Sequence, residues 1–229
     1  MPTIAVLAAQ RNGHHPNPGV RAVEAAGGKP IMAEASVGPD VLDEAGGLLV
    51  SDAGFDHEGP DAGALALLEA ALAVDMPTLL TGKGMYLLNA TFGGGEPSSI
   101  EGGTAMGSVS AGNEKATAPG REARRQIYLS PGSKMAAIIG SAGMFRLQSG
   151  AWSCRMALRE PQRSGRLMSI AYQLDDGVIE GLESKEHSWV IGLQFLPERA
   201  EEVPASFNSL LLGLVERADD FGSTGENRT

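Results

Sequence analysis

Residues 65–92 read LALLEAALAVDMPTLLTGKGMYLLNATF, and this stretch decides the fold. Residues 65–74 are almost entirely Ala and Leu, which are strong helix formers, and they predict a helix. The short apolar run at residues 77–80 predicts a buried strand, and residues 84–92 again have the composition of a helix. A helix, a strand and a helix in direct succession indicate an α/β architecture.

The same alternation extends back to the start of the chain. Residues 4–9, 29–33 and 47–51 are short apolar runs that predict three further strands. Residues 20–26 have helical spacing and end at Gly27-Gly28, a common helix stop. Because strands and helices alternate through residue 92, we predict a doubly wound, mainly parallel sheet with helices on both faces.

The pattern changes after residue 92. Residues 93–120 are rich in Gly, Ser, Thr and Ala, without periodicity, and predict a long loop that is either a lid or disordered. We expect five short strands beyond it, at residues 126–130, 144–150, 167–174, 177–183 and 189–196, and a final helix at residues 206–218. These elements predict a single domain over residues 1–221 and a disordered polar tail over residues 222–229.

Composition excludes several classes of function. The chain carries 18 Lys and Arg against 28 Asp and Glu, a net charge of −10, which disfavours nucleic acid and anionic membranes as partners. The basic residues at 121–125 are interrupted by Glu122 and form too short a cluster to change this. A single cysteine, Cys154, excludes an intrachain disulfide. With no leader and no long apolar run, we expect a cytoplasmic protein without a cofactor or a metal.

Three segments, taken in order, resemble the class I glutamine amidotransferase-like family, in its γ-glutamyl-γ-aminobutyrate hydrolase branch. They are PTLLTGKGMYLLNATFGGG at residues 77–95, YLSPGSKMAAIIG at 128–140 and DGVIEGLESKEHSWVIGLQFLPE at 176–198. In the family the first segment is a strand, a sharp elbow that carries the nucleophilic cysteine, and a helix. The last resembles a closing block that carries the catalytic His and Glu. The resemblance covers residues 27–218 and implies a flavodoxin-like sheet.

The chemistry of that family depends on a thiolate at the elbow. The helix N-terminus lowers the pKa of the thiol, a His takes and returns the proton, and a Glu orients the His. Backbone N–H groups at the elbow and after the third strand hold the oxyanion.

This sequence departs from the family at the positions that carry the chemistry. The resemblance places Gly82 at the nucleophile position, Leu196 at the catalytic His position and Glu198 at the Glu position. The Gly-Gly turn after the third strand is replaced by SDAG at residues 51–54, and the His-rich loop by QSGAWS at residues 148–153. Loss of a nucleophile or its base costs about 10⁶ in turnover, so we expect no conventional cysteine-dependent hydrolysis.

The altered positions define the residues that we expect to bind a ligand. They lie at the elbow and in the two loops described above: Asp52, Ala53, Gly82, Lys83, Gly84, Gln148 and Trp152. Lys83 is either an anchor for a carboxylate, a partner in a structural salt bridge or, if desolvated, an amine nucleophile. Trp152 either fills the space of a substrate's polar end or belongs to the core or a lid. We interpret Cys154 as a small buried thiol.

Other polar residues follow the predicted strands. His14 and His15 follow the first strand, and His57 lies among acidic residues after the third. In a doubly wound sheet these loops surround the ligand crevice, although solvated polar loops are the favoured explanation. The spacing of His57 and its acidic neighbours is not diagnostic of a metal site. Ser51 and Thr81 lack a base and are expected to form hydrogen bonds only.

Three hypotheses about function follow. In the first, the chain keeps the crevice without hydrolysis and binds a small amino-acid-like, γ-glutamyl or amide ligand. In the second, the pocket around Lys83, Asp52 and His57 catalyses a different reaction, such as a lyase, isomerase, cyclisation or acyl-transfer reaction. In the third, the chain is a regulatory partner of another enzyme or forms a homodimer.

Overall fold

Alternating side chains of the first strand point to two separate hydrophobic cores. The computed structural model describes residues 1–8, 17–36, 38–99, 124–148 and 156–226. In β1 (Thr3–Ala8), Ile4 and Val6 belong to one buried cluster, while Ala5 and Leu7 belong to the other. Because successive residues of a strand face opposite sides of the sheet, each face of the sheet is covered by its own core.

A nine-stranded sheet lies between these cores, in the order β2-β1-β3-β6-β13-β12-β11-β8-β9. The strands β2, β1, β3, β6 and β13 are parallel, and the remaining four continue the sheet in antiparallel pairs. Besides β1, the bounds are β2 (Lys29–Ala33), β3 (Gly47–Ser51), β6 (Thr78–Thr81), β8 (Arg124–Leu129), β9 (Gly143–Gln148), β11 (Leu167–Gln173), β12 (Ile179–Ser184) and β13 (Val190–Leu193).

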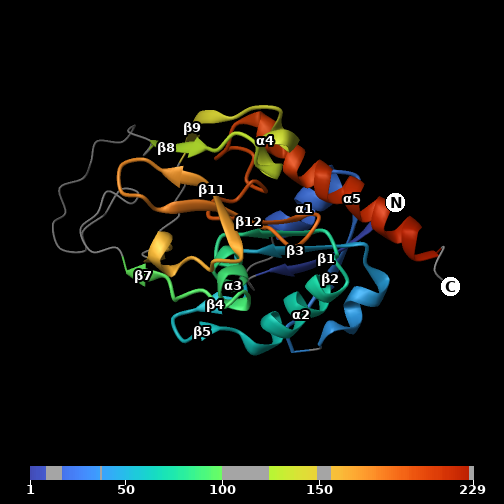
Figure 1. Ribbon diagram of the computed structural model, residues 1–229. Helices are drawn as coiled ribbons and strands as arrows, with labels where there is room; N and C mark the ends of the chain where they lie inside the picture. The colour runs from blue at the N-terminus through green and yellow to red at the C-terminus, as the bar shows by residue number, and fades with distance from the viewer. Residues whose placement is uncertain (9–16, 37, 100–123, 149–155, 227–229) are drawn as a thin grey trace, which may run out of the picture.

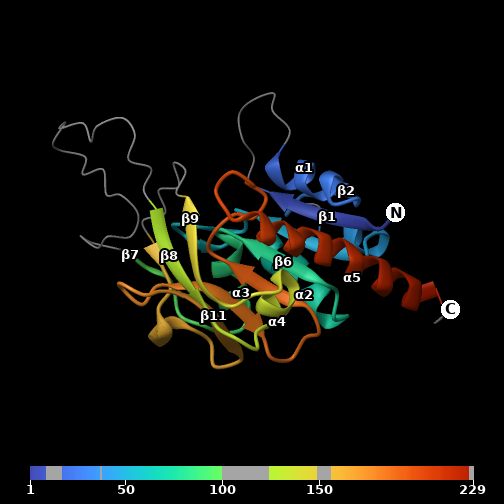
Figure 2. The ribbon, with the colours of Figure 1, turned by 90° about the horizontal axis from the view of Figure 1, so that it is seen from above.

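Helices cover both faces of the sheet (Figure 1). One face carries α2 (Ala62–Ala73) and α3 (Gly84–Thr91); the other carries α1 (Pro18–Ala25), α4 (Lys134–Ile139) and α5 (Ser209–Glu226). Figure 2 shows α5 running across the second face, with β8 and β9 at one end of the molecule and β1 and β2 at the other. This arrangement confirms the predicted α/β doubly wound fold.

Short elements complete the described part of the chain. Two small antiparallel pairs join β4 (Phe55–Asp56) to β5 (Gly59–Pro60) and β7 (Ser98–Ser99) to β10 (Met156–Ala157). Single 3₁₀ turns are η1 (Pro39–Glu44), η2 (Glu160–Gln162) and η3 (Ala205–Asn208). No helix among the described residues has both the length and the apolar character needed to cross a membrane.

The structure continues α5 to Glu226, five residues into the polar tail predicted at residues 222–229. Phe221 packs against the core beside α2, which holds the end of the helix on the body of the protein. Residues 227–229 lie outside the described residues, as does the section 100–123 of the loop predicted at residues 93–120.

Candidate functional site

The candidate site lies where three neighbouring parallel strands end. β3 ends at Ser51, β6 ends at Thr81, and these two residues are paired across the sheet. Thr81 is also paired with Leu193 at the end of β13, from which the chain continues to Leu196 and Glu198. In α/β sheets, ligands bind at the carboxyl ends of the parallel strands.

A sharp turn joins β6 to α3 at this edge. Gly82 in the turn has a φ of 58°, a left-handed conformation that favours glycine. A Cβ at this position would lie 2.5 Å from Asp52 Oδ1 and 3.1 Å from Leu196 Cδ2. Gly84 packs as closely on β3, since its Cβ would lie 3.0 Å from the carbonyl oxygen of Val50. The turn therefore requires glycine both for its backbone conformation and for its surroundings.

The carboxylate of Asp52 lies over this turn. Asp52 follows β3 directly and has a φ of 49°, which is uncommon for a residue with a side chain. Its backbone N–H donates to the carbonyl oxygen of Thr81 at 3.0 Å, which fixes it beside the end of β6. The N–H of Lys83 in turn donates to Asp52 Oδ1 at 3.3 Å. A negative side chain at the start of α3 is favoured by the helix dipole.

Glu198 lies beneath Asp52 with a buried carboxyl group. Ser51 Oγ donates to its Oε1 at 2.5 Å and Thr81 Oγ1 donates to the same oxygen at 2.7 Å. The other oxygen, Oε2, is buried and has no hydrogen-bond partner. Burial raises the pKa of Glu198, an effect that the two hydroxyl donors oppose and that the charge of Asp52 reinforces. The hydrogen bonds confirm the expected role of Ser51 and Thr81.

A cavity of about 20 Å³ lies between these groups. Its lining consists of Asn17, Pro18, Ser51, Asp52, Leu196, Glu198 and Arg199. This volume is enough for one water-sized group. Leu196 is only 4% exposed and closes one side of the cavity with an apolar side chain, while Arg199 Nη1 lies 2.9 Å from Glu202 Oε1.

The other predicted site residues are distributed around this edge. Ala53 is buried next to Asp52, whereas the side chain of Lys83 is exposed. His57, on the turn between β4 and β5, is 86% exposed and lies 3.8 Å from Glu58 Oε1. Gln148 ends β9, and its side chain lies outside the described part of the structure. Outside it altogether lie His14, His15, Trp152 and Cys154.

Sequence reasoning missed a buried network behind the elbow. Tyr86 of α3 donates its hydroxyl to the carbonyl oxygen of Met156 at 2.6 Å and accepts from Gln194 Nε2 at 2.6 Å. These bonds connect α3 to β10 and to the segment after β13. A tyrosine inside an apolar helix was the available signal, because a buried hydroxyl needs a partner.

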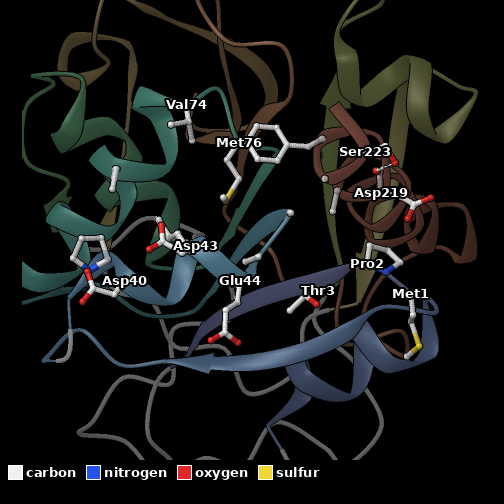
Figure 3. A pocket seen from close by; sticks show the side chains of 18 residues that line it. Met1, Pro2, Thr3, Asp40, Asp43, Glu44, Val74, Met76, Asp219 and Ser223 are labelled. Carbon is white, nitrogen blue, oxygen red and sulfur yellow. Dashed lines mark hydrogen bonds between the residues drawn. The ribbon is translucent and has the colours of Figure 1, made fainter. Parts of the chain in front are cut away.

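A larger hollow, of about 940 Å³, opens on the opposite edge of the sheet (Figure 3). It lies beside Thr3 at the start of β1, and Met76 and Val74 contribute apolar surface. Its acidic lining residues are Asp40, Asp43, Glu44 and Asp219. Over the described ranges, no group of three or more His, Cys, Asp or Glu side chains is arranged to hold a metal ion.

Comparison with known protein families identifies the family of this chain. The model of the family described as peptidase C26 matches residues 50–198, from β3 to Glu198. The chain belongs to the peptidase C26 family. The match includes Ser51, Asp52, Gly82, Leu196 and Glu198 of the site described above, while Asn17, Pro18 and Arg199 of the cavity lining lie outside it. Comparison with curated proteins yields no match.

Two solved structures share the fold of this peptidase C26 member. One is a protein assigned as a GMP synthase subunit from Thermoplasma acidophilum, with a TM-score of 0.69, 14% identity and coverage of 99% of this chain and 98% of that chain. The other is the glutaminase domain of Trypanosoma brucei CTPS with bound acivicin, with a TM-score of 0.68, 15% identity and coverage of 96% and 94%. The class I glutamine amidotransferase-like fold expected from the sequence is thereby confirmed.

Proposed function

We propose that this chain is a non-hydrolytic member of the peptidase C26 family, related to its γ-glutamyl-γ-aminobutyrate hydrolase branch. It uses the edge of the sheet around Asp52 and Glu198 to bind a small amino-acid-like, γ-glutamyl or amide ligand. One observation carries the proposal: the carboxylate of Asp52 lies against Gly82 and accepts from the N–H of Lys83.

The elbow lacks the nucleophile and the histidine base of the family. The resemblance places Gly82 at the nucleophile position, and a glycine has no side chain to attack a carbonyl carbon. Leu196 stands at the position of the base and cannot transfer a proton. Its side chain instead packs toward Gly82, where a Cβ would lie 3.1 Å from Leu196 Cδ2.

The electrostatics of the elbow also oppose acyl transfer. Stabilising an oxyanion requires free backbone N–H donors at the turn, including that of the residue after the nucleophile. Here the N–H of Lys83 already donates to Asp52, whose charge would repel a developing oxyanion. Such a site favours ligand groups that donate hydrogen bonds, such as amides and amines.

Binding without turnover is the result that tests this proposal. The purified chain is incubated with L-glutamine and with γ-glutamyl amides, while thermal unfolding reports binding and mass spectrometry reports hydrolysis. We expect a rise in Tm without product, and a smaller rise for Asp52→Asn. Asp56→Asn, an exposed carboxylate outside the cavity, is the matched control. Hydrolysis that persists in Cys154→Ala and disappears in Asp52→Asn would overturn the proposal.

A function as the partner of another enzyme is the second candidate. It is favoured by the structural neighbour named as a GMP synthase subunit, and by a groove of about 1090 Å³ between α1 and α5 that reaches Glu198. Light scattering and pull-down from a native extract test it. A stable complex or a homodimer supports this function, and a strictly monomeric chain without a partner contradicts it.

A replaced catalytic mechanism receives less support from the geometry. Of its three proposed residues, only Asp52 lies at the elbow cavity, since the side chains of Lys83 and His57 are exposed. An amine nucleophile depends on desolvation or a neighbouring cation, and exposure removes the first of these.

A further inference from the structure

Two carboxyl groups line the small cavity without a cationic partner. Asp52 and Glu198 both contribute to its wall. No ion pair connects either of them to Lys, Arg or His within the described residues. Arg199 is the basic residue of the lining, and its guanidinium is engaged by Glu202 at 2.9 Å. Neither carboxyl group is therefore paired with a basic side chain of the described residues, and a cation bound between them would stabilise the ionised form of Glu198, whose pKa is raised by burial.

The hydroxyl donors beside the cavity are already in use. The hydroxyls of Ser51 and Thr81 both donate to Glu198 Oε1, and Oε2 receives no donor. Asn17 presents Oδ1, which accepts from the N–H of Gly19 at 2.8 Å at the start of α1. Buried polar groups in proteins almost always have partners, so an orphaned carboxylate oxygen calls for a donor.

The size and chemistry of the cavity narrow the class of that donor. About 20 Å³ admits one group of the size of a water molecule and excludes a quaternary amine. Among the described residues, no group of three or more His, Cys, Asp or Glu side chains is arranged to hold a metal ion, and two carboxylates alone are a weak site for a divalent metal. A primary ammonium group has the right size, a positive charge and only donors.

We propose that this cavity binds a primary ammonium group, held by Asp52 and Glu198. The group is either a free ammonium ion or the amino terminus of an amino-acid-like ligand, and only the second source rests on the function proposed above. Leu196 excludes bulk water from one side and so strengthens the electrostatic attraction.

Salts of graded size test the site directly. Binding of ammonium, methylammonium and tetramethylammonium chloride to the purified chain is measured by thermal shift and calorimetry, with sodium and potassium chloride at the same ionic strength. We expect ammonium to bind at least tenfold more tightly than tetramethylammonium and sodium. Equal effects of all these salts, or a preference for potassium over ammonium, would overturn the assignment.

Isosteric variants connect the effect to the two carboxylates. Asp52→Asn tolerates the left-handed backbone at this position, and Glu198→Gln keeps an acceptor for Ser51 and Thr81. Each is expected to weaken ammonium binding at least tenfold, while Asp56→Asn leaves it unchanged. Circular dichroism verifies that the variants fold. Unchanged binding in both folded site variants would exclude the cavity as the site.

L-Glutamine and N-acetyl-L-glutamine distinguish this inference from the proposed function. Binding of L-glutamine but not of N-acetyl-L-glutamine supports both the ammonium site and the proposed function. If both compounds bind equally, the amino group is not recognised and the amino terminus is excluded as the bound group, while the proposed function stands. If neither amino acids nor amides bind but ammonium binds selectively, the site stands for the free ion and the ligand-binding function fails.

Discussion

The side chain of Asp52 lies where a side chain at Gly82 would point, so each residue limits what the other position can hold. The carboxylate of Asp52 occupies the space into which a side chain at position 82 would point, 2.5 Å from the position of its Cβ. Both residues have a positive φ, 49° for Asp52 and 58° for Gly82. Substitution at either position therefore has to be interpreted together with the other.

We predict that Gly82→Ala destabilises the protein by about 2–4 kcal/mol, measured by urea unfolding, because conformational strain adds to the collision with Asp52. Gly93→Ala is the control for strain alone, since φ there is 75° and a Cβ would contact nothing within 4 Å. That variant should lose only about 1 kcal/mol. Adding Asp52→Gly to Gly82→Ala should restore the stability that Gly82→Ala loses beyond Gly93→Ala. Equal losses of stability in Gly82→Ala and Gly93→Ala would contradict the collision with Asp52.

Glu198 makes stability depend on pH. Because its pKa is raised in the folded state, its contribution is fully present below the ordinary carboxyl pKa and is lost as the pH rises through the raised value. The like charge of Asp52 raises the pKa of Glu198, while the hydroxyl donors Ser51 and Thr81 lower it. Between pH 5.5 and 8.5, urea unfolding should show Glu198→Gln gaining stability relative to the wild type as the pH rises. A difference that is constant with pH would show that Glu198 is ionised throughout.

At the scale of elements, Asn89 holds the C-terminal end of α3 to the segment around η2. Its Nδ2 donates to the carbonyl oxygens of Gly95 and Gln162 at 2.9 Å, and its Oδ1 accepts from the N–H of Ser164 at 2.9 Å. The side chain of Asn89 is only 1% exposed, so water does not reach these hydrogen bonds from its side.

We predict that Asn89→Ala costs about 2–4 kcal/mol in urea unfolding, because it leaves several buried polar groups without a partner. Hydrogen exchange at the amide of Ser164 should accelerate at the same time. Thr91→Val is the matched control, because the Thr91 hydroxyl donates only to the carbonyl oxygen of Leu87 within the same helix. A loss for Asn89→Ala no larger than that of the control would contradict this role.

Elements with local signals could be predicted, and elements fixed by distant residues could not. Period and composition identified β1, α2, β6 and α3 to within a few residues. The short helix α4 was missed although Ser133 caps its start and the left-handed Gly140 ends it, because only six residues lie between these signals. A distant strand also holds its start: Glu183 of β12 accepts from the N–H groups of Lys134 and Met135 at 3.0 and 2.7 Å. No local pattern records such a contact.

The candidate site was predicted in part for the same reason. Its positions followed from the resemblance, and the hydrogen bonding of Ser51 and Thr81 followed from the lack of a base. The sequence could not show that the carboxylate of Asp52 turns back onto the N–H of Lys83, 31 residues later. That contact depends on the pairing of β3 with β6 and on a left-handed residue after β3.

On the scale of the whole molecule, the sheet separates two cores that we expect to respond independently. Ile4 of β1 belongs to the core beside α5, and Ile179 of β12 belongs to the core beside α2 and α3. Both are fully buried, and β3, β6 and β13 lie between their strands. We predict that Ile4→Val and Ile179→Val each cost about 0.5–1.5 kcal/mol in urea unfolding and that the double variant equals their sum within about 0.5 kcal/mol. A larger deviation would show that the cores are coupled through the sheet.

The shared volume at the elbow also constrains how this sequence can change over generations. Gly82→Cys alone introduces a thiol into the space of Asp52, and Leu196 provides no base to activate it. Asp52→Gly alone frees the space without supplying a nucleophile. Neither substitution alone thus produces thiol hydrolysis that selection could favour, and Gly82→Cys also lowers the stability of the protein. Under the function proposed above, single substitutions at this elbow do not lead to a hydrolase, and a lineage that carries it is expected to stay non-hydrolytic.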